Sequence, residues 1–311
     1  MHKGKIITEM KGYSVIDCEA CGFKHLDPIP TEAELEEFYK RKYFHQIKKG
    51  GRAPEIRRLI GEADEARAER EWLEKTFYTD INAILEDSGM RTGRCICDVG
   101  CGTGDFLKFM QKQGWDCTGI EPSEEGACRA TDSRITIYNC PLETFVSTYP
   151  RYSHSFDVVS LLNVLEHVPS PRAILEQVKD LLKPGSGIVV IRVPNDFTTI
   201  QQIAQTKLLK EPWWVAVPDH INYFSTESLQ RLLTSMGFET LCTTADFPME
   251  LFLLMGEDYV GNPDVGSSCH QKRKSFELSL PGEARRKLYL NLAKQGIGRD
   301  CIVFARRVTG S

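Results

Sequence analysis

From Arg94 onward, short apolar runs alternate with amphipathic segments, and this alternation is the main structural signal in the chain. The predicted strands are 95–99, 117–120, 135–138, 156–162, 187–193, 239–243 and 301–305. The predicted helices are 106–110, a segment after Ser123, a segment with apolar positions at 174, 178, 181 and 182, and a segment from 226 to 236. Alternation of this kind predicts an α/β fold with a doubly wound, largely parallel sheet.

The first 90 residues have a different pattern. They hold a cysteine pair and then two charged helical segments, 31–38 and 62–87, with no strand-like run between those segments. Later in the chain, 196–218 and the stretch after 244 are too long to be ordinary connections. We therefore predict three regions. They are an N-terminal Cys-pair and helical region at 1–90, an α/β domain at 91–244 plus 299–311, and an inserted subdomain at 245–298.

Composition narrows the function classes. The chain of 311 residues has 39 Lys and Arg against 43 Asp and Glu, a net charge of −4, so the broad basic field of a nucleic-acid-binding protein is absent. No apolar run approaches the roughly 20 residues that a membrane span needs. The eleven cysteines are an odd number and the N-terminus lacks a signal-peptide pattern. We therefore expect reduced thiols and a cytoplasmic protein.

The most informative motif is a glycine loop at the end of the 95–99 strand, Asp98-Val99-Gly100-Cys101-Gly102-Thr103-Gly104. Alternating glycines let the backbone turn sharply and let a ligand approach the main chain. A dinucleotide site needs a glycine where this chain has Asp105, and a carboxylate there would repel a pyrophosphate. The loop therefore favours a ligand with a cationic end and no phosphate, such as S-adenosylmethionine.

A second acidic residue supports a nucleoside ligand. Glu121 ends the next predicted strand, 21 positions after Gly100. A carboxylate at that position can accept two hydrogen bonds from a ribose diol. The glycine loop and Glu121 together predict one cofactor site at the carboxyl edge of the sheet.

With these motifs, the chain resembles the class I S-adenosylmethionine-dependent methyltransferases over about 94–238. The motifs that carry the resemblance are Asp98 to Gly104, Glu121, 156–159, 163–168, 182–185 and Pro194-Asn195. The resemblance implies a Rossmann-like seven-stranded sheet whose last strand is antiparallel. It also implies the cofactor-binding residues Asp98, Gly100, Cys101, Gly102, Gly104, Glu121, Pro122, Pro141, Leu142 and Asn163.

Two segments offer candidate catalytic groups for the methyl acceptor. Glu166 and His167 follow the 156–162 strand, and His220 and Tyr223 lie in a later segment rich in aromatic residues. A base is needed only if the acceptor is a hydroxyl, a protonated amine or a C–H acid. Capping of a turn by the first pair, and an aromatic hinge in the second segment, are the structural alternatives. Quinone-biosynthesis O-methyltransferases carry Glu-x-x-Glu-His here, but this chain has Asn163 at the first position, a weaker metal ligand.

The N-terminal Cys18-Glu19-Ala20-Cys21 resembles half of a zinc knuckle. It is similar to the start of methyltransferases of deoxysugar and surface-polysaccharide pathways, which begin with two such pairs. Here a second pair is absent and only His2 and His25 are nearby, so zinc binding at Cys18 and Cys21 and a metal-free remnant both stay open. Residues 40–58 hold eight basic side chains against one acid, which suits either a solvated face or a phosphate-binding patch.

These features predict an S-adenosylmethionine-dependent methyltransferase. The expected acceptor is a small polar metabolite, such as a nucleotide-linked sugar or a surface-polysaccharide precursor. We expect no nucleic-acid or membrane partner, and the oligomeric state stays open. The alternatives are a catalytically silent regulator that binds the cofactor or its demethylated product, and an O-methyltransferase of quinone-like acceptors.

Overall fold

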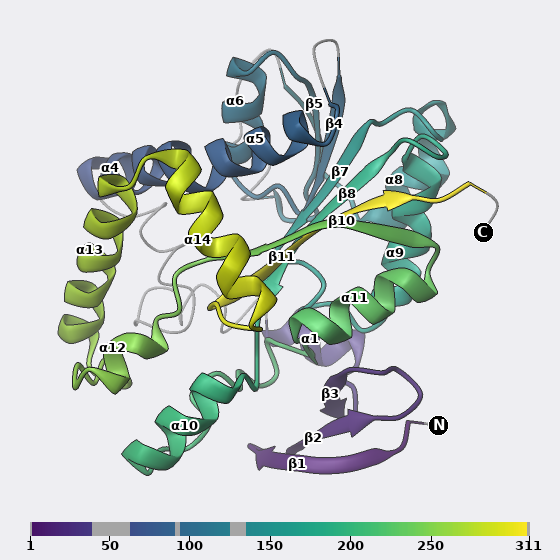
Figure 1. Ribbon diagram of the computed structural model, residues 1–311. Helices are drawn as coiled ribbons and strands as arrows, with labels where there is room; N and C mark the ends of the chain where they lie inside the picture. Colours follow the sequence, from purple (N-terminus) through teal and green to yellow (C-terminus); the bar gives the residue numbers. More distant parts are fainter. Residues whose placement is uncertain (1, 39–62, 91–93, 125–134, 310–311) are drawn as a thin grey trace.

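A computed structural model describes residues 2–38, 63–90, 94–124 and 135–309, and its main feature is a seven-stranded sheet in the order β10-β11-β8-β7-β4-β5-β6 (Figure 1). The strands are β4 Cys95–Val99, β5 Asp116–Ile120, β6 Thr136–Tyr138, β7 Val158–Leu162, β8 Ile188–Pro194, β10 Phe238–Ala245 and β11 Asp300–Arg307. The central pairs are parallel, and β11 runs antiparallel to both β8 and β10. The predicted seven-stranded Rossmann-like fold is confirmed.

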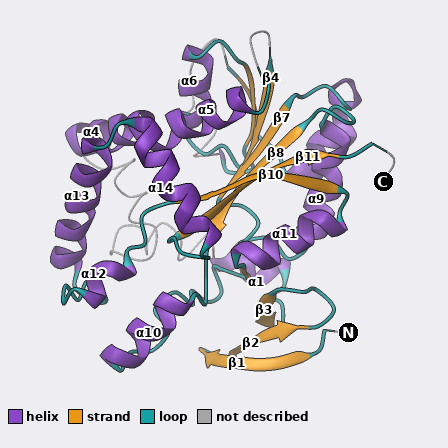
Figure 2. Ribbon diagram, viewed as in Figure 1, coloured by secondary structure: helices purple, strands orange, loops and turns teal. Residues whose placement is uncertain are grey.

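Helices cover both faces of this sheet, which explains why β8 is buried along its whole length (Figure 2). One face packs against α8 Leu142–Thr148, α9 Pro171–Leu181 and α11 Thr226–Ser235, and the strand residues that point to it include Val159 and Val189. The other face packs against α6 Asp105–Lys112 and the helical segment before β4, and it receives Val158 and Val190. Alternate strand residues thus enter two separate cores.

The predicted helix at 62–87 is described from residue 63 as three consecutive segments. These are α4 Ala63–Leu73, a π-helical turn at Glu74–Tyr78, and α5 Thr79–Asp87. The predicted short helix is α1 Glu32–Phe38, and Thr31 caps it because its hydroxyl accepts a hydrogen bond from the Glu34 N–H at 3.3 Å. The helix expected after Ser123 and the basic segment 40–58 fall largely or wholly on residues that the structure does not describe.

Helical insertions occupy the two long connections. The helices α12 Glu250–Leu254, α13 Pro263–Ser279 and α14 Gly282–Lys294 lie between β10 and β11, and α10 Thr199–Leu208 follows β8. Figure 1 shows α13 and α14 beside α4, and the Trp72 indole N–H donates to Glu277 at 2.8 Å across this contact. The helix 63–87 therefore packs against both the sheet and the later insertion.

The two helices expected in the N-terminal region are present, but the part around the cysteine pair, for which no structure was predicted, forms a sheet. Residues 4–27 form an antiparallel sheet, β1 Gly4–Met10, β2 Tyr13–Cys18 and β3 Lys24–Asp27, which is completed by β9 Asn222–Tyr223. This N-terminal sheet escaped prediction because the longest apolar run of β1 is the pair Ile6-Ile7 and none of its positions is buried. Its small core includes Val15, Leu26 and Tyr223.

Candidate functional site

The glycine loop leaves β4 and enters α6 with an open main chain. Gly100, Gly102 and Gly104 have φ angles of +73°, +52° and +70°, which disfavour residues with a side chain. A Cβ on Gly100 would lie 2.8 Å from the Val164 Cγ2 atom, so a larger residue would also collide with the turn after β7. The loop is therefore shaped for a close ligand and lies against the segment that carries Glu166.

Two predicted cofactor residues place acidic groups beneath this loop. The Glu121 carboxylate accepts hydrogen bonds from the Gly102 N–H and the Ser123 N–H, both at 2.8 Å. Asp98 is buried and accepts a hydrogen bond from the Ser160 hydroxyl at 2.6 Å. Burial raises the pKa of Asp98 to about 7, and the neighbouring Glu121 charge adds to the increase. A cationic ligand would relieve the repulsion between these two acids.

Asp105, which was expected to repel a pyrophosphate, interacts with side chains of its own loop and helix. Its carboxylate accepts a hydrogen bond from the Thr103 hydroxyl at 2.8 Å and lies 3.6 Å from the Lys108 ammonium. Lys108 therefore partly neutralises the acid that begins α6. The negative character of the loop depends mainly on Asp98 and Glu121.

The remaining predicted cofactor residues differ in how exposed they are. Cys101 is buried within the loop, Pro122 is exposed after β5, and Pro141 caps α8. Leu142 lies in the main core. Asn163 directly follows β7 and has a φ of +62° and an exposed side chain. These positions leave Pro122, Pro141 and Asn163 accessible at the carboxyl edge of the sheet.

Asn139 joins two of the cofactor loops, and it was not among the predicted site residues. Its side-chain amide donates to the Glu121 carbonyl at 2.8 Å. Asn139 follows β6 and Glu121 follows β5, so the contact fixes neighbouring strand ends. Its position directly after a strand was the available sequence signal.

The two predicted catalytic segments meet at the same edge. The His167 Nε2 atom lies 3.7 Å from the Glu166 carboxylate, and the His167 and His220 rings are 4.8 Å apart in an edge-to-face arrangement. The His167 Nδ1 atom lies 2.8 Å from the Asp219 carbonyl oxygen and 3.2 Å from its carboxylate. Sequence analysis had not assigned a role to Asp219, whose contact with His167 spans 52 residues. We call Glu166, His167, Asp219 and His220 the acid–histidine cluster.

Electrostatics make this cluster able to hold and exchange protons. Glu166 is 1% exposed, and burial raises its pKa to about 7. Burial opposes the charged form of His167, but the Glu166 and Asp219 carboxylates outweigh burial and raise its pKa to about 9. Glu166, His167 and His220 each have one carboxylate oxygen or ring nitrogen that could bind a metal. These three atoms lie within 4.8 Å of one another, so they could hold a divalent ion.

Tyr223 does not join the acid–histidine cluster closely. It is 1% exposed, it packs in the core of the N-terminal sheet, and its ring centre lies 6.4 Å from that of His220. The neighbouring Asn222, which sequence analysis passed over, donates from its side-chain amide to the Leu165 and Val168 carbonyls at 2.9 and 2.7 Å. Asn222 thus supports the turn that carries Glu166 and His167.

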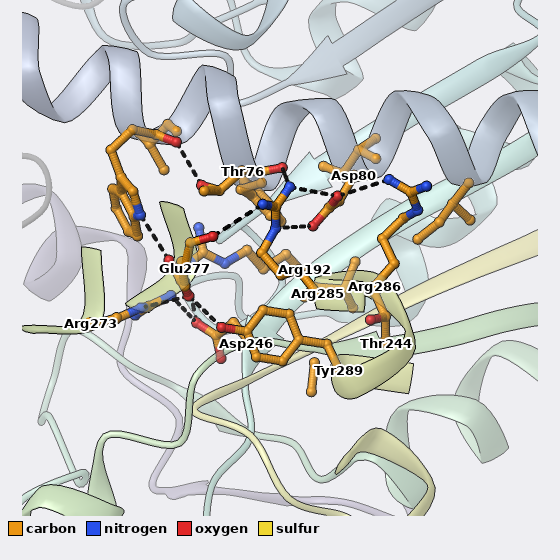
Figure 3. A pocket seen from close by; sticks show the side chains of 17 residues that line it. Thr76, Asp80, Arg192, Thr244, Asp246, Arg273, Glu277, Arg285, Arg286 and Tyr289 are labelled. Atoms are coloured by element: carbon orange, nitrogen blue, oxygen red, sulfur yellow. Dashed lines mark hydrogen bonds and ion pairs between the residues drawn. The ribbon is translucent and has the colours of Figure 1, made fainter. Parts of the chain in front are cut away.

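A separate pocket lined by both charged and apolar side chains lies between the 63–87 helix, the insertion and the sheet, and Figure 3 shows it from close by. It encloses about 530 Å³, part of it open to solvent. Its charges are paired with one another: Arg285 donates to Asp80 at 2.8 and 2.9 Å, and Arg273 donates to Asp246 at 2.9 Å. Because these groups satisfy each other, they join the helices around the pocket, and the described residues that line it offer no set of unpaired charges to a ligand.

Comparison with known proteins identifies the domain. A family model described as a methyltransferase domain matches residues 66–243, more than half of the chain. A ubiquinone biosynthesis O-methyltransferase from Photorhabdus laumondii is 32% identical over 141 residues, which cover 44% of this chain and 53% of the relative. The same enzyme from Vibrio cholerae is 32% identical over 114 residues, 35% of this chain and 45% of the relative. The chain thus spans about half the length of the curated relatives it matches.

Two solved structures have the same overall fold. The plantazolicin methyltransferase BpumL in complex with SAH is 17% identical, with a TM-score of 0.51 over 88% of this chain and 94% of that one. The cyclase SpnF is also 17% identical, with a TM-score of 0.51 over 90% of this chain and 98% of that one. At this level of identity the likeness concerns the fold alone. No helix in the described ranges is long and apolar enough to cross a membrane.

Proposed function

The chain belongs to the methyltransferase domain family, and from that premise we propose that it transfers a methyl group from S-adenosylmethionine to a hydroxyl of a small polar metabolite. The Gly100–Gly104 loop would hold the methionyl end of the cofactor, and Glu121 would hold the ribose. The acidic pair of Asp98 and Glu121 supports a cationic cofactor in preference to a pyrophosphate.

The observation that carries the proposal is the acid–histidine cluster at the end of β7, next to the glycine loop. A hydroxyl is a poor nucleophile until its proton is removed, and a buried carboxylate with a pKa of about 7 suits a base near neutral pH. We assign proton removal to Glu166. His167, with a pKa of about 9, stays protonated and stabilises the carboxylate and the developing charge of the acceptor.

Methyl transfer is an in-line displacement, in which the acceptor oxygen attacks the methyl carbon and the neutral thioether leaves. Alignment of the two reactants and exclusion of water supply most of the acceleration that such a site needs. The acceptor would lie between the loop and the cluster, with Asn163 on the path to the sulfonium.

Two acceptor classes deserve direct comparison. Nucleotide-linked sugars follow from the resemblance of the N-terminal Cys pair to sugar methyltransferases. Phenolic, quinone-like acceptors follow from the curated relatives at 32% identity. Both classes present a hydroxyl, so both need the same base.

The test incubates the full chain with methyl-labelled S-adenosylmethionine and each acceptor class, and it measures formation of S-adenosylhomocysteine and labelled product. Calorimetry measures cofactor binding in parallel, and Glu121→Ala serves as the cofactor-site control. We expect turnover with one class, and lower turnover in that variant at limiting cofactor. Cofactor binding without turnover across the whole panel would reject the enzyme in favour of a regulator. Binding of a nicotinamide dinucleotide in place of S-adenosylmethionine would reject the cofactor.

A further inference from the structure

Four residues of the N-terminal sheet converge on one point. The His2 Nδ1 atom lies 3.5 Å from the Cys18 Sγ atom and 3.3 Å from the Cys21 Sγ atom. With a ring nitrogen of His25, the four ligand atoms lie within 4.8 Å of one another. Bond lengths of 2.0–2.3 Å give the edges of a tetrahedral zinc site a length of about 3.3–3.8 Å. Small side-chain rotations would bring all four atoms into that geometry.

His25 already has the arrangement of a metal-binding histidine. Its ring is 1% exposed, and its Nδ1 atom lies 2.8 Å from the Leu26 carbonyl oxygen. A carbonyl only accepts hydrogen bonds, so Nδ1 carries the proton and Nε2 carries the lone pair. That buried Nε2 atom has no hydrogen-bond partner in the described part of the chain, which is rare for a buried polar atom. A backbone carbonyl that orients the ring in this way is typical of zinc-bound histidines.

The backbone also holds the two cysteines in a knuckle. The Gly22 N–H donates to the Cys18 carbonyl at 2.9 Å, and Gly22 has a φ of +76° that a residue with a side chain would resist. The Glu19 N–H donates to the Lys3 carbonyl at 3.0 Å, which keeps His2 beside the turn. Both cysteines are free thiols, so no disulfide competes for the sulfur atoms.

We propose that His2, Cys18, Cys21 and His25 bind one zinc ion. Two thiolates and two imidazoles in a tetrahedral arrangement are a donor set that selects zinc. Four protein ligands leave no open position, so the ion is structural and takes no part in methyl transfer. The two histidines, which the sequence places near the cysteines, take the place of the absent second cysteine pair.

The site connects to the acid–histidine cluster through paired strands. His25 of β3 lies opposite Asn222 of β9, and the Asn222 side chain holds the turn from Leu165 to Val168. The knuckle also contacts the methyltransferase domain directly, because Arg231 of α11 donates to the Gly22 carbonyl at 3.2 Å. A bound ion would therefore fix the N-terminal sheet as a wall of the acceptor site.

The experiment measures metal in the full chain, purified with a C-terminal tag so that His2 is not disturbed. Elemental analysis should give one zinc per chain, and cobalt substitution should produce a thiolate-to-cobalt charge-transfer band. His2→Gln and Cys21→Ser should retain the metal against a chelator at least about tenfold less well. His2→Cys should keep it, since three cysteines and one histidine also form zinc sites. His154→Gln and Cys242→Ser, which change residues outside the cluster, should match the unmodified chain.

Zinc absent from the unmodified chain, together with no cobalt band, would overturn the proposal. Equal metal retention in His2→Gln and in His154→Gln would also overturn it, because His2 would then not be a ligand. His2 is exposed and near the chain end, so His2→Gln should fold, and a thermal melt checks that point. None of these readouts needs methyl transfer, so the zinc proposal and the proposed function fail independently.

Discussion

At the residue scale, the Glu121 carboxylate has two roles, one in ordering the glycine loop and one in the proposed cofactor contact. Its carboxylate accepts two main-chain N–H groups around the glycine loop and, in the proposed function, two ribose hydroxyls. Glu121→Ala should weaken S-adenosylmethionine binding by about 1–3 kcal/mol, the cost of leaving such donors unpaired. Titration calorimetry measures the change. Glu239→Ala, an exposed acid on β10, is the matched control, and equal affinities in the two variants would reject the ribose contact.

Glu166 and His167 predict the pH dependence of the reaction. Raising the pH through about 7 converts Glu166 to its base form, so kcat/KM should rise there. Raising it through about 9 removes the His167 proton, so the rate should fall again. Glu166→Gln should abolish the lower limb and reduce kcat by about 10²- to 10⁴-fold. The exposed Glu176→Gln should keep the full profile. An unchanged lower limb in Glu166→Gln would show that another group is the base.

At the element scale, the main sheet was predictable and the N-terminal sheet was not. Strands such as β8 are buried on both faces, so their sequences are continuous apolar runs. β1 mixes polar and apolar residues without a buried position, and β9 has only two residues, so neither gives a clear local signal. The cysteine pair pointed to a metal module, but its histidine partners come from the chain start and from β3. Pairing of β1 with β2 and of β2 with β3 brings them together.

The two-residue strand β9 supports the turn after β7 through the side chain of Asn222. Asn222 is 2% exposed and donates two hydrogen bonds to carbonyls of the turn after β7. Asn222→Asp places an acceptor against two acceptors, so it should impair that turn more than Asn222→Ala does. We expect about a tenfold or greater loss of kcat for Asp, with cofactor affinity unchanged. Steady-state kinetics and calorimetry test this, with the exposed Asn291→Asp as control. Wild-type kcat in Asn222→Asp would exclude the supporting role.

At the scale of the whole molecule, the cofactor-binding part of the site was easier to predict from the sequence than the contacts between distant segments. Asp98, the glycines and Glu121 are close in sequence or follow consecutive strands, so topology alone brings them together. The acid–histidine cluster was predicted as two separate candidate segments, and only Glu166 and His167 were expected at the carboxyl edge of the sheet. The contacts that join the insertion to the 63–87 helix were not predicted. They link residues about 205 positions apart, as in the Arg285–Asp80 pair, and such pairs leave no local pattern.

That pair provides a test of how the insertion is attached. The Arg285 side chain is 4% exposed and Asp80 is 13% exposed, and the guanidinium also donates to the Glu277 carbonyl at 3.2 Å (Figure 3). Arg285→Met should remove two of the hydrogen bonds to Asp80, which keeps Arg286 at 3.3 Å, and reduce the free energy of unfolding by up to about 3–5 kcal/mol. Denaturant unfolding measures the loss, and Lys287→Met, an exposed neighbour on α14, should cost little.

The double variant Arg285→Met with Asp80→Leu separates the two ways in which this pair can act. If the pair mainly prevents an unbalanced buried charge, removing both partners should recover most of the stability lost in Arg285→Met. If the double variant is as unstable as the single one, the guanidinium's bonds to main-chain carbonyls attach the insertion. Calorimetric affinity for S-adenosylmethionine should stay unchanged in the folded protein in either case, because Gly100 to Gly104 and Glu121 do not line this pocket. A loss of affinity would mean that the insertion and the cofactor loop are coupled.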